Sequence, residues 1–335
     1  MTYEQIINDL KNKVYHPVYF LTGDEPFYID SVSNYIEEHV LEEAEKSFNQ
    51  NVLYGKETSV QDIVSEAKRF PMMSNHNVVI VKEAQHLSTK LDDLIPYLEN
   101  PLSSTILVFE YKYKTLDKRT KIYKNLTKNK HVVYFESKKL YDNQLPDWVI
   151  NFVKSKGFSI NPKAAMLLSE FVGNDLSRLS KEIEKLFINL NPGDEVTSNH
   201  IEENIGISKE FNNFELNKAI ATLNIKKANQ IVLYFSKNEK NNPIFVTIST
   251  LYNFFTNILK YHYTKDKSSK NLAAALGISP YFLNEYHTAA RNFTIRRAVK
   301  AIETLKIYDL KAKGVDNAST TQGELLKELI FQLLN

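Results

Sequence analysis

The chain contains no cysteine, which removes disulfide frameworks, thiol nucleophiles and cysteine-based zinc sites together. No run of about 18 or more apolar residues occurs, and the first residues lack an apolar core of signal-peptide length. We therefore expect a cytoplasmic protein with no membrane-spanning segment. With 335 residues, 43% of them hydrophobic, the chain is long enough for two or three domains with apolar cores.

Motifs of the common catalytic classes are also missing. The eight histidines are scattered without a His-Glu-x-x-His pattern, and no Gly-x-Ser-x-Gly elbow exists. Carboxylate pairs such as Asp92-Asp93 and Glu202-Glu203 fall on polar helical faces, where solvation explains them. These absences argue against an ordinary enzyme, and we expect neither a cofactor nor a metal site.

The first apolar run leads into a degraded phosphate-binding loop. A working loop needs two glycines that let the backbone wrap the phosphates, then Lys for charge and Ser or Thr for magnesium. Here only Gly23 remains. Asp24 and Glu25 add negative charge where phosphates would lie, and Pro26 removes a backbone donor. The segment therefore predicts very poor triphosphate binding.

Residues 1–140 alternate between short apolar runs and segments with helical spacing. Strands that are apolar on both faces and alternate with helices indicate a parallel sheet covered on both sides. After about Leu140 the strand patterns stop, and helical periodicity continues to the end. The sequence therefore predicts an α/β domain in 1–140, a small helical domain in 141–208 and a helical bundle in 209–335. The five expected strands lie at 18–21, 51–54, 78–81, 105–109 and 132–135.

Charge is distributed unevenly behind a net value of +2. Residues 1–208 hold 24 Lys and Arg against 30 Asp and Glu, whereas residues 209–335 hold 18 against 10, so the two parts carry −6 and +8. A basic C-terminal region can attract a phosphate backbone. A lysine-rich solvated surface explains the same pattern equally well.

Four groups of short motifs are spread over nearly the whole chain. They are YFLTGDEPFYID at 19–30; TLDKR at 115–119; GNDL at 173–176 with EIEKL at 182–186; and GISPY at 277–281 with AAR at 289–291 and YDLK at 308–311. Each motif is weak alone, but their joint order and spacing are fairly specific. Together they resemble the delta subunit of the bacterial DNA polymerase III clamp loader.

This resemblance implies an AAA+-like α/β module with a parallel five-stranded sheet, a helical lid and a helical collar. It further implies a subunit, not itself catalytic, that binds and opens the sliding clamp for loading onto primed DNA without hydrolysing ATP. The implied partners are the beta clamp, the gamma/tau and delta prime subunits of a heteropentameric ring, and primed DNA. The degraded phosphate loop at Gly23, Asp24 and Glu25 agrees with this expectation.

In the family, an apolar pair in the turn between a helix and the third strand grips the clamp. The matching segment here is 69–75, where we expect Pro71 to end the helix and push Met72 and Met73 outward. Many relatives carry Leu or Phe there, and two Met residues depart from that pattern. Methionine is flexible and polarizable, which suits a groove that accepts several ligands.

One other arrangement of this turn has to be weighed. Met72 and Met73 can instead fold back to cap the domain's own core, and the residues alone favour that reading. We expect Phe70 to be in the core, since it continues the helix face of Ile63 and Ala67.

The last region holds basic candidates for contact with a template backbone inside the ring, although collar residues also pair with neighbouring subunits. They are Arg291, Arg296, Arg297, Lys300, Lys311 and Lys313. Two further functions stay open. One is an AAA+-derived adaptor that binds nucleic acid alone through 209–335, and the other is an ATP-binding motor with an atypical phosphate loop.

Overall fold

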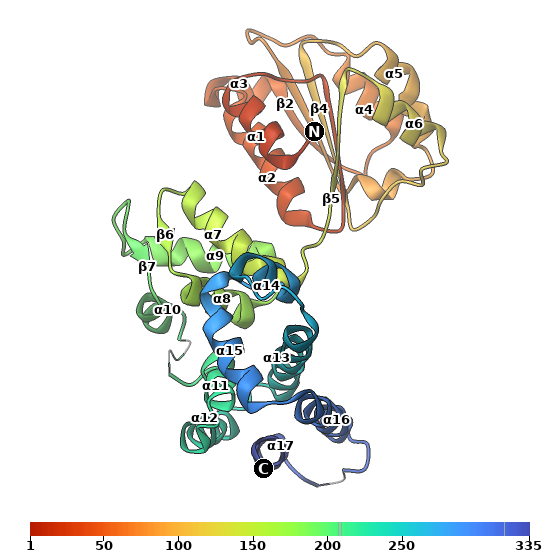
Figure 1. Ribbon diagram of the computed structural model, residues 1–335. Helices are drawn as coiled ribbons and strands as arrows, with labels where there is room; N and C mark the ends of the chain where they lie inside the picture. Colours follow the sequence, from red (N-terminus) through yellow and green to blue (C-terminus); the bar gives the residue numbers. More distant parts are fainter. Residues whose placement is uncertain (207, 209, 318) are drawn as a thin grey trace. The chain divides into compact units, whose positions relative to one another are not determined.

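The computed structural model describes residues 1–206, 208, 210–317 and 319–335. The chain divides into two compact units, Met1–Leu140 and Tyr141–Asn335, which run from red to yellow and from yellow-green to blue in Figure 1. Within the described residues no helix is both long and apolar enough to cross a membrane.

The first unit is built around a parallel sheet with the strand order β2-β3-β4-β1-β5 (Figure 1). Every residue of β1 and almost every residue of β3 and β4 is buried, whereas the edge strand β2 is only partly covered. Central strands covered on both faces read as continuous apolar runs, which explains why their positions could be predicted. The strands are β1 Val18–Gly23, β2 Gln50–Tyr54, β3 Asn77–Lys82, β4 Thr105–Lys112 and β5 Val132–Ser137.

Helices cover both faces of this sheet (Figure 1). Val18 and Phe20 face one core, and Tyr19 and Leu21 face the other, as the period of two along a strand requires. The first core is completed by α4 (Val60–Ala67), α5 (Ile95–Glu99) and α6 (Lys121–Lys128), together with the 3₁₀ turns η1 (Ala84–Leu87) and η2 (Leu91–Leu94). The second is completed by α1 (Tyr3–Lys11) and α2 (Pro26–His39), while α3 (Glu43–Asn49) leads into β2. The predicted α/β class is confirmed.

The second unit is mainly helical, as predicted. One difference is a pair of two-residue parallel strands, β6 Ser159–Ile160 and β7 Glu195–Val196, which are too short to leave a pattern in the sequence. Helix α8 ends at Gly173, whose φ of 75° lies in the left-handed region that glycine adopts readily. The first helices are α7 Leu145–Ser155, preceded by η3 Asp142–Gln144, then α8 Pro162–Val172, α9 Leu176–Phe187 and α10 Ser198–Ile205.

The remaining helices share one hydrophobic core, in which Phe235, Phe254, Phe255 and Phe293 are fully buried. They are α11 Asn213–Ala221, α12 Ile225–Lys237, α13 Ile244–Tyr263, α14 Ser269–Leu276, η4 Pro280–Phe282, α15 Leu283–Asn292, α16 Ile295–Ala312 and α17 Gln322–Leu334. The predicted boundary after residue 208 adjoins residue 209, which lies outside the described residues, and it stays a prediction.

Candidate functional site

The α4–β3 turn, residues 68–76, carries the predicted apolar pair. Met73 is 100% exposed and Met72 is 56% exposed, while Pro71 is partly buried. Apolar side chains of this size are ordinarily covered in a folded domain. The alternative in which both Met side chains cap the domain's own core is therefore not what the structure shows.

We expected Pro71 to end helix α4, but the helix already ends at Ala67. A longer helix would pair the Ala67 carbonyl with the N–H of residue 71, and proline has none. Two side chains take this carbonyl instead: Thr105 Oγ1 donates to it at 2.8 Å and Tyr97 Oη donates at 3.3 Å. Pro71 thus limits the helix through a missing hydrogen bond.

The early helix end overturns the prediction for Phe70, which is 76% exposed instead of being in the core. Lys68 is the C-cap, so the backbone leaves the helical period before it reaches residue 70. A further exposed side chain, Phe48 in α3 at 63%, was not predicted to contribute here. Its neighbour in the sequence, Asn49, is hydrogen-bonded to the Met72 backbone. No pattern along the sequence links residue 48 to residue 72.

Buried polar groups hold the backbone of the turn. Asn49 is 1% exposed; its Nδ2 donates to the Met72 carbonyl at 2.9 Å, and its Oδ1 accepts from the Met72 N–H at 2.6 Å. Met73 adopts φ 53°, in the left-handed region that bulky residues avoid at a cost of about 1 kcal/mol or more. The turn is therefore ordered although its side chains are exposed.

Few charges lie on the turn itself. Arg69 forms an ion pair with Glu66 at 2.8 Å between Nη1 and Oε2, and the exposed Lys68 adds a positive charge at the start of the turn. At the other end, burial lowers the pKa of His76 below its ordinary value, and its ring packs edge-on against Tyr15 at 5.2 Å between centroids. These features suit an apolar contact better than an ionic one.

The phosphate-loop segment, Gly23 to Glu25, has its backbone donors already used. The Gly23 N–H donates to the Lys114 carbonyl at 3.1 Å, and the Asp24 N–H donates to the Ser137 carbonyl at 3.3 Å. The Glu25 N–H donates to Ser137 Oγ at 3.3 Å. A phosphate loop needs such N–H groups directed at its ligand, and here they are directed at β5 and at the chain after β4.

The N-terminus of α2 is closed in a similar way. Glu25, 3% exposed, is its N-cap, and its carboxylate accepts from the Phe27 N–H at 3.2 Å. A carboxylate satisfies the positive end of the helix dipole where a phosphate would otherwise do so. The helix end is thus occupied by the protein's own anion.

A lysine links this helix to the sheet. Lys112 Nζ lies 2.5 Å from Asp30 of α2 and 2.9 Å from the buried carboxylate of Glu110. Burial opposes the charge of Lys112, but hydrogen bonds to both carboxylates outweigh burial and raise the pKa of Lys112 above its ordinary value. At the end of β3, Glu83 accepts a hydrogen bond from Gln85. In the described part of the chain no group of three or more His, Asp or Glu side chains could hold a metal ion.

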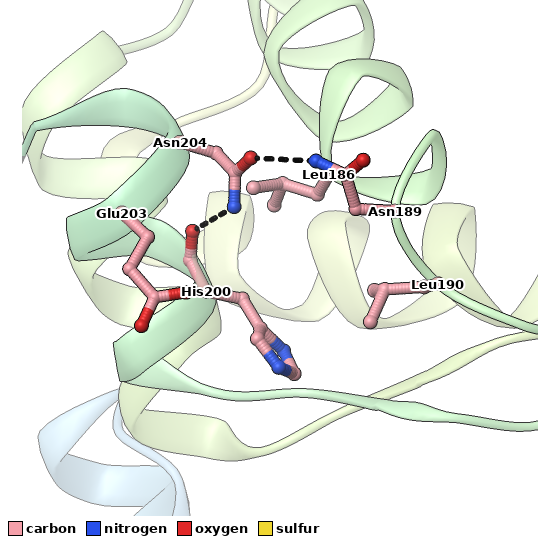
Figure 2. Close-up of a pocket in the computed structure, with 6 residues that line it drawn as sticks. All are labelled: Leu186, Asn189, Leu190, His200, Glu203 and Asn204. Atoms are coloured by element: carbon pink, nitrogen blue, oxygen red, sulfur yellow. Dashed lines mark hydrogen bonds between the residues drawn. The ribbon is translucent and has the colours of Figure 1, made fainter.

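A hollow in the second unit is lined by Leu186, Asn189, Leu190, His200, Glu203 and Asn204 (Figure 2). Asn204 Nδ2 donates to the His200 carbonyl at 2.8 Å, and Asn189 Nδ2 donates to Asn204 Oδ1 at 3.2 Å. His200 Nδ1 accepts from the Thr197 N–H at 3.2 Å and so serves as part of the cap of α10. The hydrogen-bonded groups of Asn189, His200 and Asn204 therefore stabilise local helix structure, and no Ser, Thr, Cys or Lys lies among the lining residues.

The basic candidates lie at both ends of α16 and at the end of α15. Arg297 stacks on the Phe293 ring at 4.8 Å, Lys311 lies 4.9 Å from the Tyr308 ring centroid, and Lys313 pairs with Asp309 at 2.6 Å. The other three basic candidates are exposed, and among the described residues they form no ion pair: Arg291, Arg296 and Lys300.

Fold and sites together define a class: a parallel α/β module whose phosphate-loop segment has its N–H groups bound internally, followed by helical structure. Two family models match the chain. The model described as DNA polymerase III, delta subunit, matches residues 19–136, and the model of the delta subunit's C-terminal domain matches residues 210–333. The chain belongs to the DNA polymerase III delta subunit family.

Similar proteins agree over the full length. DNA polymerase III subunit delta of Bacillus subtilis (strain 168) is 28% identical over 337 residues, covering 97% of this chain and 95% of the relative. The solved structure of the Bacillus subtilis DNA clamp loader delta protein (YqeN) matches with a TM-score of 0.56 and 26% identity, covering 99% of each chain.

Proposed function

We propose that this protein is a clamp-loader subunit that binds and opens the sliding clamp for loading onto primed DNA, without hydrolysing ATP itself. The observation that supports this best is the exposed Met72 and Met73 pair on an anchored turn, in a chain of the delta-subunit family. An apolar surface held in solvent by buried hydrogen bonds is typical of a protein contact site. Pro71, Met72 and Met73 are the proposed contact residues.

The chemistry of the turn fits an apolar groove on the clamp. Burial of each Met side chain contributes roughly 1.5–3 kcal/mol before the cost of ordering is subtracted. Phe70 is a further exposed apolar side chain of the same turn and enlarges the area available for contact. Since the contact is mainly apolar, its affinity depends only weakly on salt.

The closed phosphate-loop segment supports a role without ATP hydrolysis. Its N–H groups donate to Lys114 and Ser137, and the Glu25 carboxylate caps α2. A triphosphate would have to break these bonds and would meet two carboxylates of the same sign. ATP binding elsewhere in the loader then regulates this subunit through its neighbours.

The helical second unit is the proposed site of loader assembly, in cytoplasmic complexes with gamma/tau and delta prime subunits. We divide it into a lid, 141–208, and a collar, 209–335. Exposed apolar side chains such as Ile225 at 50% and Phe331 at 62% are available for contacts between subunits. Arg291, Arg296 and Lys300 are better placed for primed DNA than Arg297, Lys311 and Lys313, whose charged groups already contact the protein.

The decisive experiment is binding of the full-length protein to the sliding clamp of the same organism, measured by isothermal titration calorimetry without ATP. Replacement of both Met72 and Met73 by Ala is expected to weaken binding by about 100-fold or more, because most of the buried apolar area is lost. Ile188→Ala, which removes an apolar side chain that is 79% exposed in the second unit, is the control and leaves binding unchanged. Equal affinity in the double variant would remove this site assignment.

A further inference from the structure

Asn49, the last residue of α3, makes an unusual set of hydrogen bonds for an asparagine. It is 1% exposed, although asparagine ordinarily lies on the protein surface. Its Nδ2 donates to the Glu45 carbonyl at 3.1 Å and to the Met72 carbonyl at 2.9 Å, and its Oδ1 accepts from the Met72 N–H at 2.6 Å. One side chain therefore satisfies both backbone polar groups of a residue 23 positions away.

This pairing restricts the peptide groups on both sides of Met72. The Met72 N–H belongs to the peptide bond that precedes the residue, and its carbonyl belongs to the peptide bond that follows it. When both are bound to one rigid carboxamide, neither peptide plane rotates without breaking a hydrogen bond. The fixed second plane leads directly into Met73, whose φ of 53° persists only when the surrounding structure holds it.

We propose that Asn49 is a positioning residue for the clamp-binding turn, which orders the Met72 backbone before the clamp arrives. The proposal rests on the proposed function, and it adds a residue that is buried and does not itself touch the partner. Ordering a backbone residue costs conformational entropy. A turn that is ordered in the free protein loses this entropy on folding and not on binding, so more of the apolar contact energy appears as affinity.

The chain provides a matched control in Asn129, in the same unit. Asn129 Nδ2 donates to the Leu98 carbonyl at 2.6 Å, and its Oδ1 accepts from the His131 N–H at 2.9 Å. It therefore makes the same two kinds of hydrogen bond as Asn49, between α5 and the start of β5 and not at the α4–β3 turn. A purely structural Asn49 would behave like Asn129 when it is replaced.

The experiment compares Asn49→Ala, Asn49→Asp and Asn129→Ala in the full-length protein, by thermal melting and by titration with the sliding clamp of the same organism. Asn49→Asp keeps the side-chain size and the acceptor for Met72 N–H but loses the donor for the Met72 carbonyl, so it carries the test if the Ala variant does not fold. Both Asn49 variants are expected to weaken clamp binding by about 10-fold, and Asn129→Ala by less than about twofold. Equal affinities for the Asn49 and Asn129 variants, compared at the same folded fraction, would overturn the proposal.

Methionine methyl NMR reads the turn directly, because the four Met residues of the chain include Met72 and Met73. In free protein the Asn49 variants are expected to shift and narrow these two methyl signals and to leave that of the partly buried Met166 in α8 unchanged. Unchanged Met72 and Met73 signals would also overturn the proposal. If the Met72 and Met73 double variant keeps its affinity, the clamp site itself fails and this role fails with it. If the double variant loses affinity while the Asn49 variants keep it, only the positioning role is removed.

Discussion

The phosphate-loop segment and the α4–β3 turn belong to the same unit, but they differ in which chemical groups are available to a ligand or partner. In the first, the N–H groups of Gly23, Asp24 and Glu25 all donate to the protein itself. In the second, the polar backbone of Met72 is bound internally while the apolar side chains face solvent. In a fold of this type the loop is where a ligand would be expected, but here its N–H groups are bound internally, and the turn is the surface that we propose for contact with a partner.

The largest expected effect concerns Gly23, where a substitution tests whether close packing holds the phosphate-loop segment in place. Its φ is 125°, and a Cβ there would lie 2.0 Å from the Ser137 carbonyl oxygen. Gly23→Ala is therefore expected to destabilise the protein by about 2–4 kcal/mol, measured by urea unfolding. The strand end and β5 would have to separate to admit the methyl group.

Gly157→Ala is the control for backbone strain alone. Gly157 has φ 84°, but no atom lies within 4 Å of an added Cβ, so its replacement is expected to cost about 1 kcal/mol. Equal costs at positions 23 and 157 would show that close packing does not hold the phosphate-loop segment shut.

Replacement of Met73 is expected to have a smaller effect, which raises stability but weakens clamp binding. Asn adopts the left-handed region more readily than Met, so Met73→Asn should stabilise the free protein by about 0.5 kcal/mol while it weakens clamp binding by about 10-fold. Urea unfolding and calorimetric titration measure the two changes separately. Loss of stability in this variant would argue that the Met73 side chain packs within the free protein.

The smallest effect concerns pH at the downstream end of the turn. Burial lowers the pKa of His76, so its folded state favours the neutral ring, and the unfolded chain binds more protons as pH falls below about 6.5. His76 thus contributes stability that is present above that pH and is lost as pH falls through the lowered pKa. His76→Gln should reduce the loss of stability between pH 7 and pH 5, followed by urea unfolding. An unaltered pH profile would contradict this assignment.

Much of the first unit could be predicted because burial on both faces leaves continuous apolar runs, as in Val78 to Val81 of β3. The exposure of Phe70 could not, since it depends on where α4 ends. Pro71 limits α4 locally, but the Ala67 carbonyl at its end accepts hydrogen bonds from Thr105 and Tyr97, which are distant in sequence. The short strands β6 and β7 were missed for a related reason, because two residues carry no periodicity.

The sequence by itself determined the class of fold and the weakness of the phosphate loop, because strand burial and the loss of Lys and glycine are local properties of composition. It also directed attention to Met72 and Met73 through the resemblance at 69–75. Only the tertiary structure decided that the N–H groups of the loop donate to the protein itself, that Phe70 is exposed in the turn, and that Asn49 is hydrogen-bonded to Met72. These features are contacts between segments distant along the chain, and their distances exist only after the sheet and its helices have packed.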